Sequence, residues 1–446
     1  MKMPLFESFR LKFEKPDWSR NPEFGLLDTI LEQHPELIRI GESDVLRGCL
    51  QSEFGRQDMP SVEQIVRAAI YKEMKGLDYR ELEYAQIDSR ICEQFVKLDN
   101  RAPLSFQVFQ KYISKISEES LQQILFSLNK IAISEGLEDV NQLRQDSTVV
   151  ETNIHYPTNN SLIWDCIKDS HRLLTQLAAE VKNLDYRDYS KGAKKTFFKI
   201  NFTKGADKRK DLFRKQLITF TKCINQVANV VKKNPGCSFS AFFIIGELEN
   251  LLPLMQQVYE MAWRKQINDE TVPNDKKIFS IYERHTDIIV KGQREVQFGH
   301  KINLTTGKSS LILNCEVLKG NPRDSTLYQH TIDKIINDYQ IIPRDSVTDG
   351  GYASKDNVEH CQQKGIANIV FNKIVGSLKN ITSSKNMETR LKKWRSGIEA
   401  VISNLKRGYK IFRCNWKGEA HFKQKVLWSV IAYNIRVMTA AVVAQL

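Results

Sequence analysis

The sequence has 446 residues, enough for about three domains or for one core with large insertions. Hydrophobic residues make up 41% and charged residues 27%, which excludes a disordered tail, a collagen-like fibre and a disulfide-stapled mini-protein. The formal charge is +13, from 66 Lys and Arg against 53 Asp and Glu, and this excess favours a polyanionic partner.

The eight cysteines are scattered and form no CxxC pair, so neither a disulfide framework nor a zinc site is expected. The first residues lack the apolar stretch of a signal peptide. The most apolar long segment, residues 426–446, carries Asn434 and Arg436 in its middle, which favours a buried terminal helix over a membrane span. We therefore expect a soluble cytoplasmic protein without a membrane partner.

Basic residues are concentrated in two windows of the sequence. Residues 182–233 contain fifteen Lys or Arg against four Asp or Glu, and residues 373–425 contain fourteen against three. Such clustering is typical of a surface that binds phosphates. The alternative for each window is an ordinary solvated helix face.

The predicted elements begin with helices. Residues 24–135 show helical spacing of apolar residues, with a break at Gly76 and with Asp78 and Asp88 as expected helix caps. Short helices joined by tight turns favour a compact bundle that binds DNA, dimerises or does both. We expect a helical N-terminal domain of this kind at residues 1–137.

The pattern changes at about residue 140. β-branched residues predict a strand at 143–154, and helical spacing returns at 162–265. Later strands are predicted at 278–290, 295–304, 309–317, 345–348 and 366–371, with a helix at 324–338 capped by Asp324 and further helices from 388 onward. TTGKSS at 305–310 predicts a hairpin turn and not a P-loop, because Ile302 stands where the first glycine would be.

This order of elements predicts a mixed α/β core with a helical, basic insertion after its first strand. The core is expected at residues 138–155 and 276–446, and the insertion at residues 156–275.

Three acidic residues stand out from their surroundings. Asp146 lies inside the first predicted strand, where a charge is costly unless it is paired or binds a metal. Asp349 ends a short strand and is followed by two glycines, which allow a sharp turn and the close approach of a ligand. Glu399 lies on a predicted helix that places Arg395 and Lys406 on the same face.

Each acid also has a simpler interpretation, as an edge-strand surface residue, a turn former and a surface ion-pair partner. In a basic protein the three together indicate a metal site, because carboxylates are hard oxygen ligands suited to Mg²⁺ or Mn²⁺. Three carboxylates can hold two ions that activate an attacking oxygen and stabilise a leaving one at a phosphodiester.

The sequence around these acids resembles a known family. DST at 146–148, TDGGYAS at 348–354 and RSGIEAVISNLKRGY at 395–409 resemble the two aspartate motifs and the glutamate signature of bacterial insertion-sequence DDE transposases. IAYNIRVM at 431–438 is similar to the family's closing helix, and residues 60–98 are similar to the helical N-terminal domain of one large transposase group. The tyrosine of the signature is absent, since its position is Lys392. The resemblance covers residues 60–440 apart from the insertion.

The resemblance implies an RNase H-like core, with Asp146 on its first strand, Asp349 on its fourth and Glu399 on a following helix. It implies that these three residues are catalytic and bind Mg²⁺, with about two ions per site and Mn²⁺ as a substitute. A DNA transposase of this kind cuts the ends of its element and joins the freed 3′-hydroxyl to target DNA. The expected form is a nucleoid-associated homodimer or larger assembly.

Basic residues near these acids and in the insertion are the candidates for contacts with double-stranded DNA, at the element ends and at the target. They are Arg395, Lys406, Arg407, Lys194, Lys195, Lys208, Arg209 and Lys210. Trp394 and Trp416 lie among basic residues and either stack on bases or pack in the core. Two alternative functions stay open: a metal-dependent nuclease that only cuts, and a non-catalytic DNA-binding repressor derived from a transposase.

Overall fold

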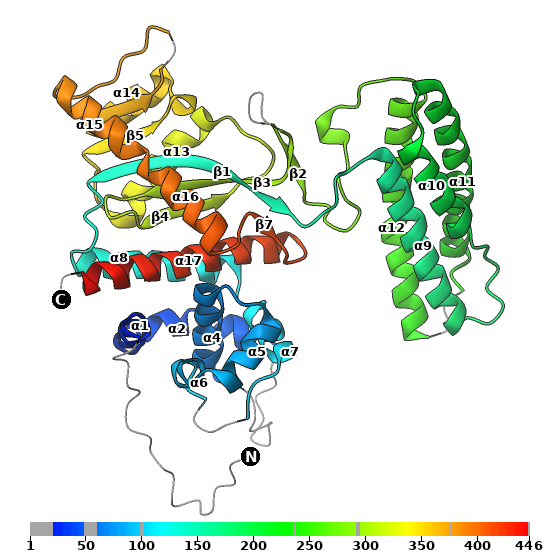
Figure 1. Ribbon diagram of the computed structural model, residues 1–446, viewed down its shortest axis with the longest axis horizontal. Coiled ribbons are helices and arrows are strands. Elements are labelled where there is room, and N and C mark those ends of the chain that lie inside the picture. Colours follow the sequence, from blue (N-terminus) through cyan, green and yellow to red (C-terminus); the bar gives the residue numbers. More distant parts are fainter. Residues whose placement is uncertain are drawn as a thin grey trace, which may run out of the picture. The chain divides into compact units, whose positions relative to one another are not determined.

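The structure is a computed structural model that describes residues 21–48, 60–98, 102–235, 238–290, 295–374 and 376–444. The chain divides into two compact units (Figure 1). The first unit contains residues 1–152 and 299–446, and the second contains residues 153–298.

Helices form the N-terminal part of the first unit. They are α1 (Pro22–Gln33), α2 (Glu36–Arg39), α3 (Glu42–Leu46), α4 (Val62–Lys75), α5 (Tyr79–Asp88), α6 (Arg90–Phe95), α7 (Phe106–Ile113) and α8 (Glu118–Ser134). The predicted break at Gly76 is confirmed, because this residue ends α4 with φ of 64°. Asp78 caps α5 as predicted, but Asp88 is not a cap. It is the last residue of α5, and Ser89 caps α6 by accepting the amide hydrogen of Cys92.

A mixed sheet follows the N-terminal helices. Its strands in the first unit are β1 (Gln142–Thr152), β3 (Gln297–Thr306), β4 (Ile312–Val317), β5 (Asp345–Asp349), β6 (Asn368–Asn372) and the short β7 (Arg413–Cys414). The spatial order is β4, β3, β1, β5, β6, and β7 pairs with the end of β1. β3 is antiparallel to β1 and β4, whereas β5 and β6 run parallel to β1. The predicted mixed α/β fold is confirmed, and Asp349 ends the fourth of the five main strands.

The turn at 305–310 joins β3 to β4 as predicted, and the amide of Gly307 donates to the carbonyl oxygen of Leu311 at 2.9 Å. The strand predicted at 278–290 is wrong for most of its length. Only β2 (Asp287–Ile289) is a strand there, after the short helix η2 (Asn274–Lys276). The Ser280 hydroxyl accepts hydrogen bonds from the amides of Tyr282 and Glu283, both at 3.1 Å, and such local bonds favour turns over strands.

Helices cover the sheet and complete the first unit (Figure 1). They are α13 (Asp324–Tyr339), the short η3 (Gly350–Tyr352), α14 (Lys355–Gln363), α15 (Lys385–Arg395), α16 (Gly397–Gly408) and α17 (Glu419–Val443). α17 packs against α1, α4 and α8, so helices from both ends of the chain share one core. By length and composition α17 could cross a membrane, but most of its apolar stretch is buried in this unit, as in a core helix.

The second unit is a helical bundle with a hydrophobic core of its own. It consists mainly of α9 (Asn159–Glu180), α10 (Ser190–Phe202), α11 (Ala206–Lys233) and α12 (Phe239–Gln266), and the three long helices lie alongside one another (Figure 1). Apolar residues at helical spacing along α9, α11 and α12 fill the interior, including Leu173, Phe220 and Leu248.

Candidate active site

Asp146 and Asp349 lie on adjacent parallel strands. Gln145 of β1 is opposite Thr348 of β5, so the next residue along each strand is one of the two aspartates. Residues at the same register on neighbouring strands present their side chains on the same face of a sheet. The sheet therefore brings two of the predicted site residues side by side.

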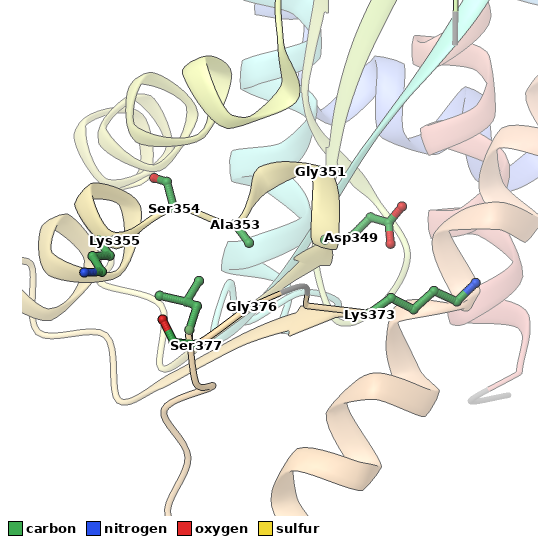
Figure 2. A pocket seen from close by; sticks show the side chains of 10 residues that line it. Asp349, Gly351, Ala353, Ser354, Lys355, Lys373, Gly376 and Ser377 are labelled. Carbon is green, nitrogen blue, oxygen red and sulfur yellow. The ribbon is translucent and has the colours of Figure 1, made fainter. Parts of the chain in front are cut away.

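The turn after β5 requires glycine. A Cβ atom on Gly350 would lie 2.6 Å from the carbonyl oxygen of Lys373 and 2.7 Å from that of Asn372, which is too close for any side chain. The close approach of these two backbone segments holds Asp349 at the end of its strand. Asp349 and Lys373 lie on one side of a pocket of about 660 Å³, with Ser354 and Lys355 on the other side (Figure 2). Ser354 caps α14, as predicted.

Burial and nearby carboxylates together raise the pKa of the Tyr352 hydroxyl. Burial raises the pKa of Tyr352 well above its ordinary value, and the charges of Asp324, Asp146 and Asp349 raise it further. The phenol stays protonated and donates a hydrogen bond to Asn303 Oδ1 at 2.9 Å. Tyr352 thus anchors the turn after β5 close to both aspartates of the proposed site.

Glu399 is joined to Asp146 through Arg395. Arg395 Nη2 donates to Asp146 Oδ2 at 2.9 Å, and Nη1 donates to Glu399 Oε1 at 2.7 Å. The Arg395 side chain is 8% exposed, whereas that of Glu399 is 63% exposed. The contact expected from the four-residue spacing is present, although Ser396 interrupts the helix between α15 and α16. Arg395 is therefore an internal cation shared by two carboxylates.

No three His, Cys, Asp or Glu side chains are grouped to hold a metal ion within the part of the chain that the structure describes. The Arg395 guanidinium supplies the positive charge that balances Asp146 and Glu399. Asp146 and Glu399 are oxygen ligands of the kind that hard divalent cations prefer, but here both pair with Arg395.

Arg144 stabilises the junction between α15 and α16 through contacts with Trp394. Its Nη1 donates to the carbonyl oxygen of Trp394 at 2.8 Å, and its guanidinium lies over the Trp394 ring, 4.6 Å from the centroid. Its Nε and Nη2 donate to the hydroxyls of Thr306 and Ser310 at 2.9 and 2.7 Å. Sequence reasoning missed this residue, although a second charge in the buried first strand was a usable signal.

Gly397 packs directly against Arg144, and a Cβ atom there would lie 2.1 Å from Arg144 Nη1. Three hydrogen bonds fix this guanidinium, so we expect Gly397→Ala to displace the start of α16 and to cost about 1–3 kcal/mol of stability. Gly192→Ala is the control, because a Cβ atom on Gly192 meets nothing within 4 Å. Urea unfolding measures the cost, and an equal free energy of unfolding for both variants would contradict the packing argument.

Asp324 is not the helix cap that the sequence predicts. It is the first residue of α13, and the preceding residue makes no side-chain capping bond. Its Oδ1 instead accepts from the Ser147 hydroxyl at 2.8 Å and pairs with Lys301 Nζ at 2.6 Å. A buried ammonium group such as that of Lys301 is costly without a carboxylate partner. This explains why Asp324 pairs with Lys301 and does not cap α13. Asp324 thereby ties α13 to the residue after Asp146.

The predicted DNA contacts belong to both units. In the first, Lys406 is half-buried with its ammonium 5.7 Å from the centroid of the Phe412 ring, and burial lowers its pKa, while Arg407 is exposed. In the second, Lys194, Lys195, Lys208 and Arg209 are exposed on α10 and α11, whereas Lys210 pairs with Asp269 at 2.8 Å.

Both tryptophans pack within the protein. Trp394 lies beneath Arg144 and contacts a small cluster that contains Val347 and Leu391. The Trp416 ring packs against Tyr79, with 5.8 Å between the ring centroids. Of the two interpretations open for them, the structure supports core packing.

Residues 277–435 match the family model described as the transposase DDE domain. The matched segment contains Asp349 and Glu399 but not Asp146. Comparison with curated proteins and with solved structures gives no significant match.

The family match covers residues 277–435, and in this segment, which contains β3, β4, β5 and β6 of the mixed sheet, the chain is similar to a transposase DDE domain. More particularly, the match supports a DDE transposase of the insertion-sequence type, as the resemblance of the motifs implies.

Proposed function

We propose that the protein is a DNA transposase that cuts the ends of its insertion sequence and joins the freed 3′-hydroxyl to target DNA. The observation that carries the proposal is the bridge from Asp146 through Arg395 to Glu399, beside the strand that ends at Asp349. A non-catalytic repressor has no need of three carboxylates at a phosphate-binding surface. Because the ends of an element must be brought together, a homodimer or larger assembly is the proposed active form.

Asp146, Asp349 and Glu399 are the proposed ligands of divalent ions, Mg²⁺ or Mn²⁺. When bound, such ions activate an attacking oxygen and stabilise a leaving oxygen at a phosphodiester. Two further residues have proposed positioning roles. Arg144 bonds to Trp394 at the α15–α16 junction, and Asp324 joins α13 to β1 through Ser147. Arg395 and Lys406 are proposed to hold DNA phosphates, which requires Arg395 to leave at least one of its carboxylate partners.

We expect Arg395→Gln to raise the affinity of the DNA-free protein for Mn²⁺ by about tenfold. The change removes the cation that balances Asp146 and Glu399, so that the two carboxylates attract a divalent ion more strongly. Arg390→Gln is the matched control, because Arg390 is an exposed arginine on the same helix. Mn²⁺ binding is measured by electron paramagnetic resonance. Affinity equal to or weaker than that of the wild type would contradict this role of Arg395.

The test of the function is product analysis with purified protein, Mg²⁺ and labelled DNA that carries the ends of its own element. A transposase gives cleaved ends and joined products, and chelation of the metal abolishes both. A nuclease gives cleavage without joining, and a repressor gives only a bound complex. Either of the last two results would overturn the proposal.

A further inference from the structure

The short helix α10 presents a face that is both basic and aromatic. Its exposed side chains recur at intervals of three and four residues, so they lie along one side of the helix. They are Lys191, Lys194, Lys195, Phe198, Lys199 and Phe202. The opposite side packs into the bundle through Ala193 and Ile200, which are buried. The helix contains no Asp or Glu, so its outer face is basic, and the nearby acid that interacts with it is Asp188, close to Lys191.

The two phenylalanines on this face are open to solvent. The exposed fraction is 47% for Phe198 and 81% for Phe202. They are four residues apart, which places their Cβ atoms about 5–6 Å from each other. Large apolar groups gathered on an exposed surface are typical of a binding site. On α10 such a site has rings and ammonium groups on the same face.

The face is held rigidly before any ligand binds. Asn160 of α9 donates from its Nδ2 to the carbonyl oxygen of Phe197 at 3.0 Å and to Asn201 Oδ1 at 2.8 Å. The Phe197 ring is stacked on Trp164 of α9, with 6.1 Å between the centroids and 29° between the planes. Rigid presentation lowers the entropic cost of binding.

The combination of charges and rings indicates the chemistry of the ligand. Lysines contact the phosphates of any nucleic acid, but an aromatic side chain needs a free base face, which a duplex does not offer. Phe198 and Phe202 are neighbours on the helix surface, and successive bases of one strand stack on such aromatic side chains. A helix that binds a membrane surface instead segregates its apolar residues from its lysines, and α10 mixes them on one face.

We propose that α10 binds unpaired nucleotides, with bases stacked on Phe198 and Phe202 and phosphates held by the four lysines of the same face. The proposal rests on the proposed function, because the cutting of element ends produces the strands that such a site would hold. The proposal places a single-strand site in the second unit. This site is separate from the DNA phosphate contacts proposed for Arg395 and Lys406 in the first unit.

The test uses the full-length protein and two fluorescein-labelled ligands, an oligothymidine strand and a duplex of the same length. We expect the double variant Phe198→Ala/Phe202→Ala to bind the single strand at least about tenfold more weakly, with duplex affinity within about twofold of wild type. The matched control is Phe239→Ala/Phe243→Ala, which removes two exposed phenylalanines of α12, 90% and 66% exposed, and should change neither affinity. Phe198→Trp/Phe202→Trp should retain single-strand binding, because it keeps the stacking surface.

The outcomes separate this inference from the proposed function. Unchanged single-strand binding by the alanine variant overturns the inference, as does an equal loss for both ligands. Wild-type protein that binds only the duplex overturns it as well and leaves the proposed function intact, whereas wild-type protein that binds neither ligand overturns both. If the alanine variant loses self-association in sedimentation while it binds the single strand normally, the face is a contact between copies and the inference is wrong.

Discussion

Glu73→Gln is expected to lower the free energy of unfolding of the first unit by about 3–5 kcal/mol. Glu73 of α4 is buried and pairs with two ammonium groups, Lys72 Nζ at 2.7 Å and Lys425 Nζ of α17. The neutral amide leaves two buried ammonium groups without the carboxylate that they share. Lys425→Met should cost less, because the pair of Glu73 and Lys72 remains.

The control is Glu118→Gln, which breaks a partly exposed ion pair, 3.0 Å long, between α8 and Lys423 of α17 and should cost less than about 1 kcal/mol. Burial raises the pKa of Glu73, but the charges of Lys425 and Lys72 outweigh it and bring the pKa below its ordinary value. A depressed carboxyl pKa stabilises the fold above the unfolded-state pKa of about 4.3, and this contribution is lost as the pH falls further. Urea unfolding above and below a pH of about 4.3 measures both the cost of each substitution and the pH dependence of stability. Equal costs for the two Glu→Gln variants would refute the account of the buried cluster.

Asp349→Ala is expected to lower DNA cleavage and joining at least about 1,000-fold while leaving DNA affinity within about twofold. Asp349 lies at the end of β5 beside Asp146, and the turn after it depends on Gly350 and Tyr352 rather than on its carboxylate. The loss should therefore be chemical and not structural. Asp356→Ala is the control, because Asp356 is an exposed acid on the neighbouring helix α14.

Local sequence signals predicted the elements that carry the proposed site. The β-branched run around Asp146, the glycines after Asp349 and the four-residue spacing of Arg395 and Glu399 each have a local physical cause, and β1, the turn after β5 and the Arg395–Glu399 ion pair are present. Periodicity likewise predicted the helices of the second unit. These features depend on residues close together in the sequence, which is why the sequence alone sufficed.

Contacts between residues distant in sequence could not be predicted in this way. The bonds of Arg144 to Trp394 and of Asp324 to Ser147 join residues that are far apart in the chain and meet only in the folded sheet. Most of the strand expected at 278–290 is absent, because the Ser280 hydroxyl bonds nearby amides and favours turns there. Apolar spacing does not reveal such bonds. The side of α10 that faces water became known only from the packing of Ala193 and Ile200.

The most direct test of the central claim compares wild-type protein with Asp349→Ala on labelled element ends in Mg²⁺. Cleaved and joined DNA are measured on a denaturing gel, and DNA binding is measured in parallel. We expect both products from the wild type and from Asp356→Ala, and neither from Asp349→Ala, which should still bind the ends. If Asp349→Ala cleaves like the wild type, or if the wild type binds the ends without cutting them, Asp146, Asp349 and Glu399 are not the catalytic site.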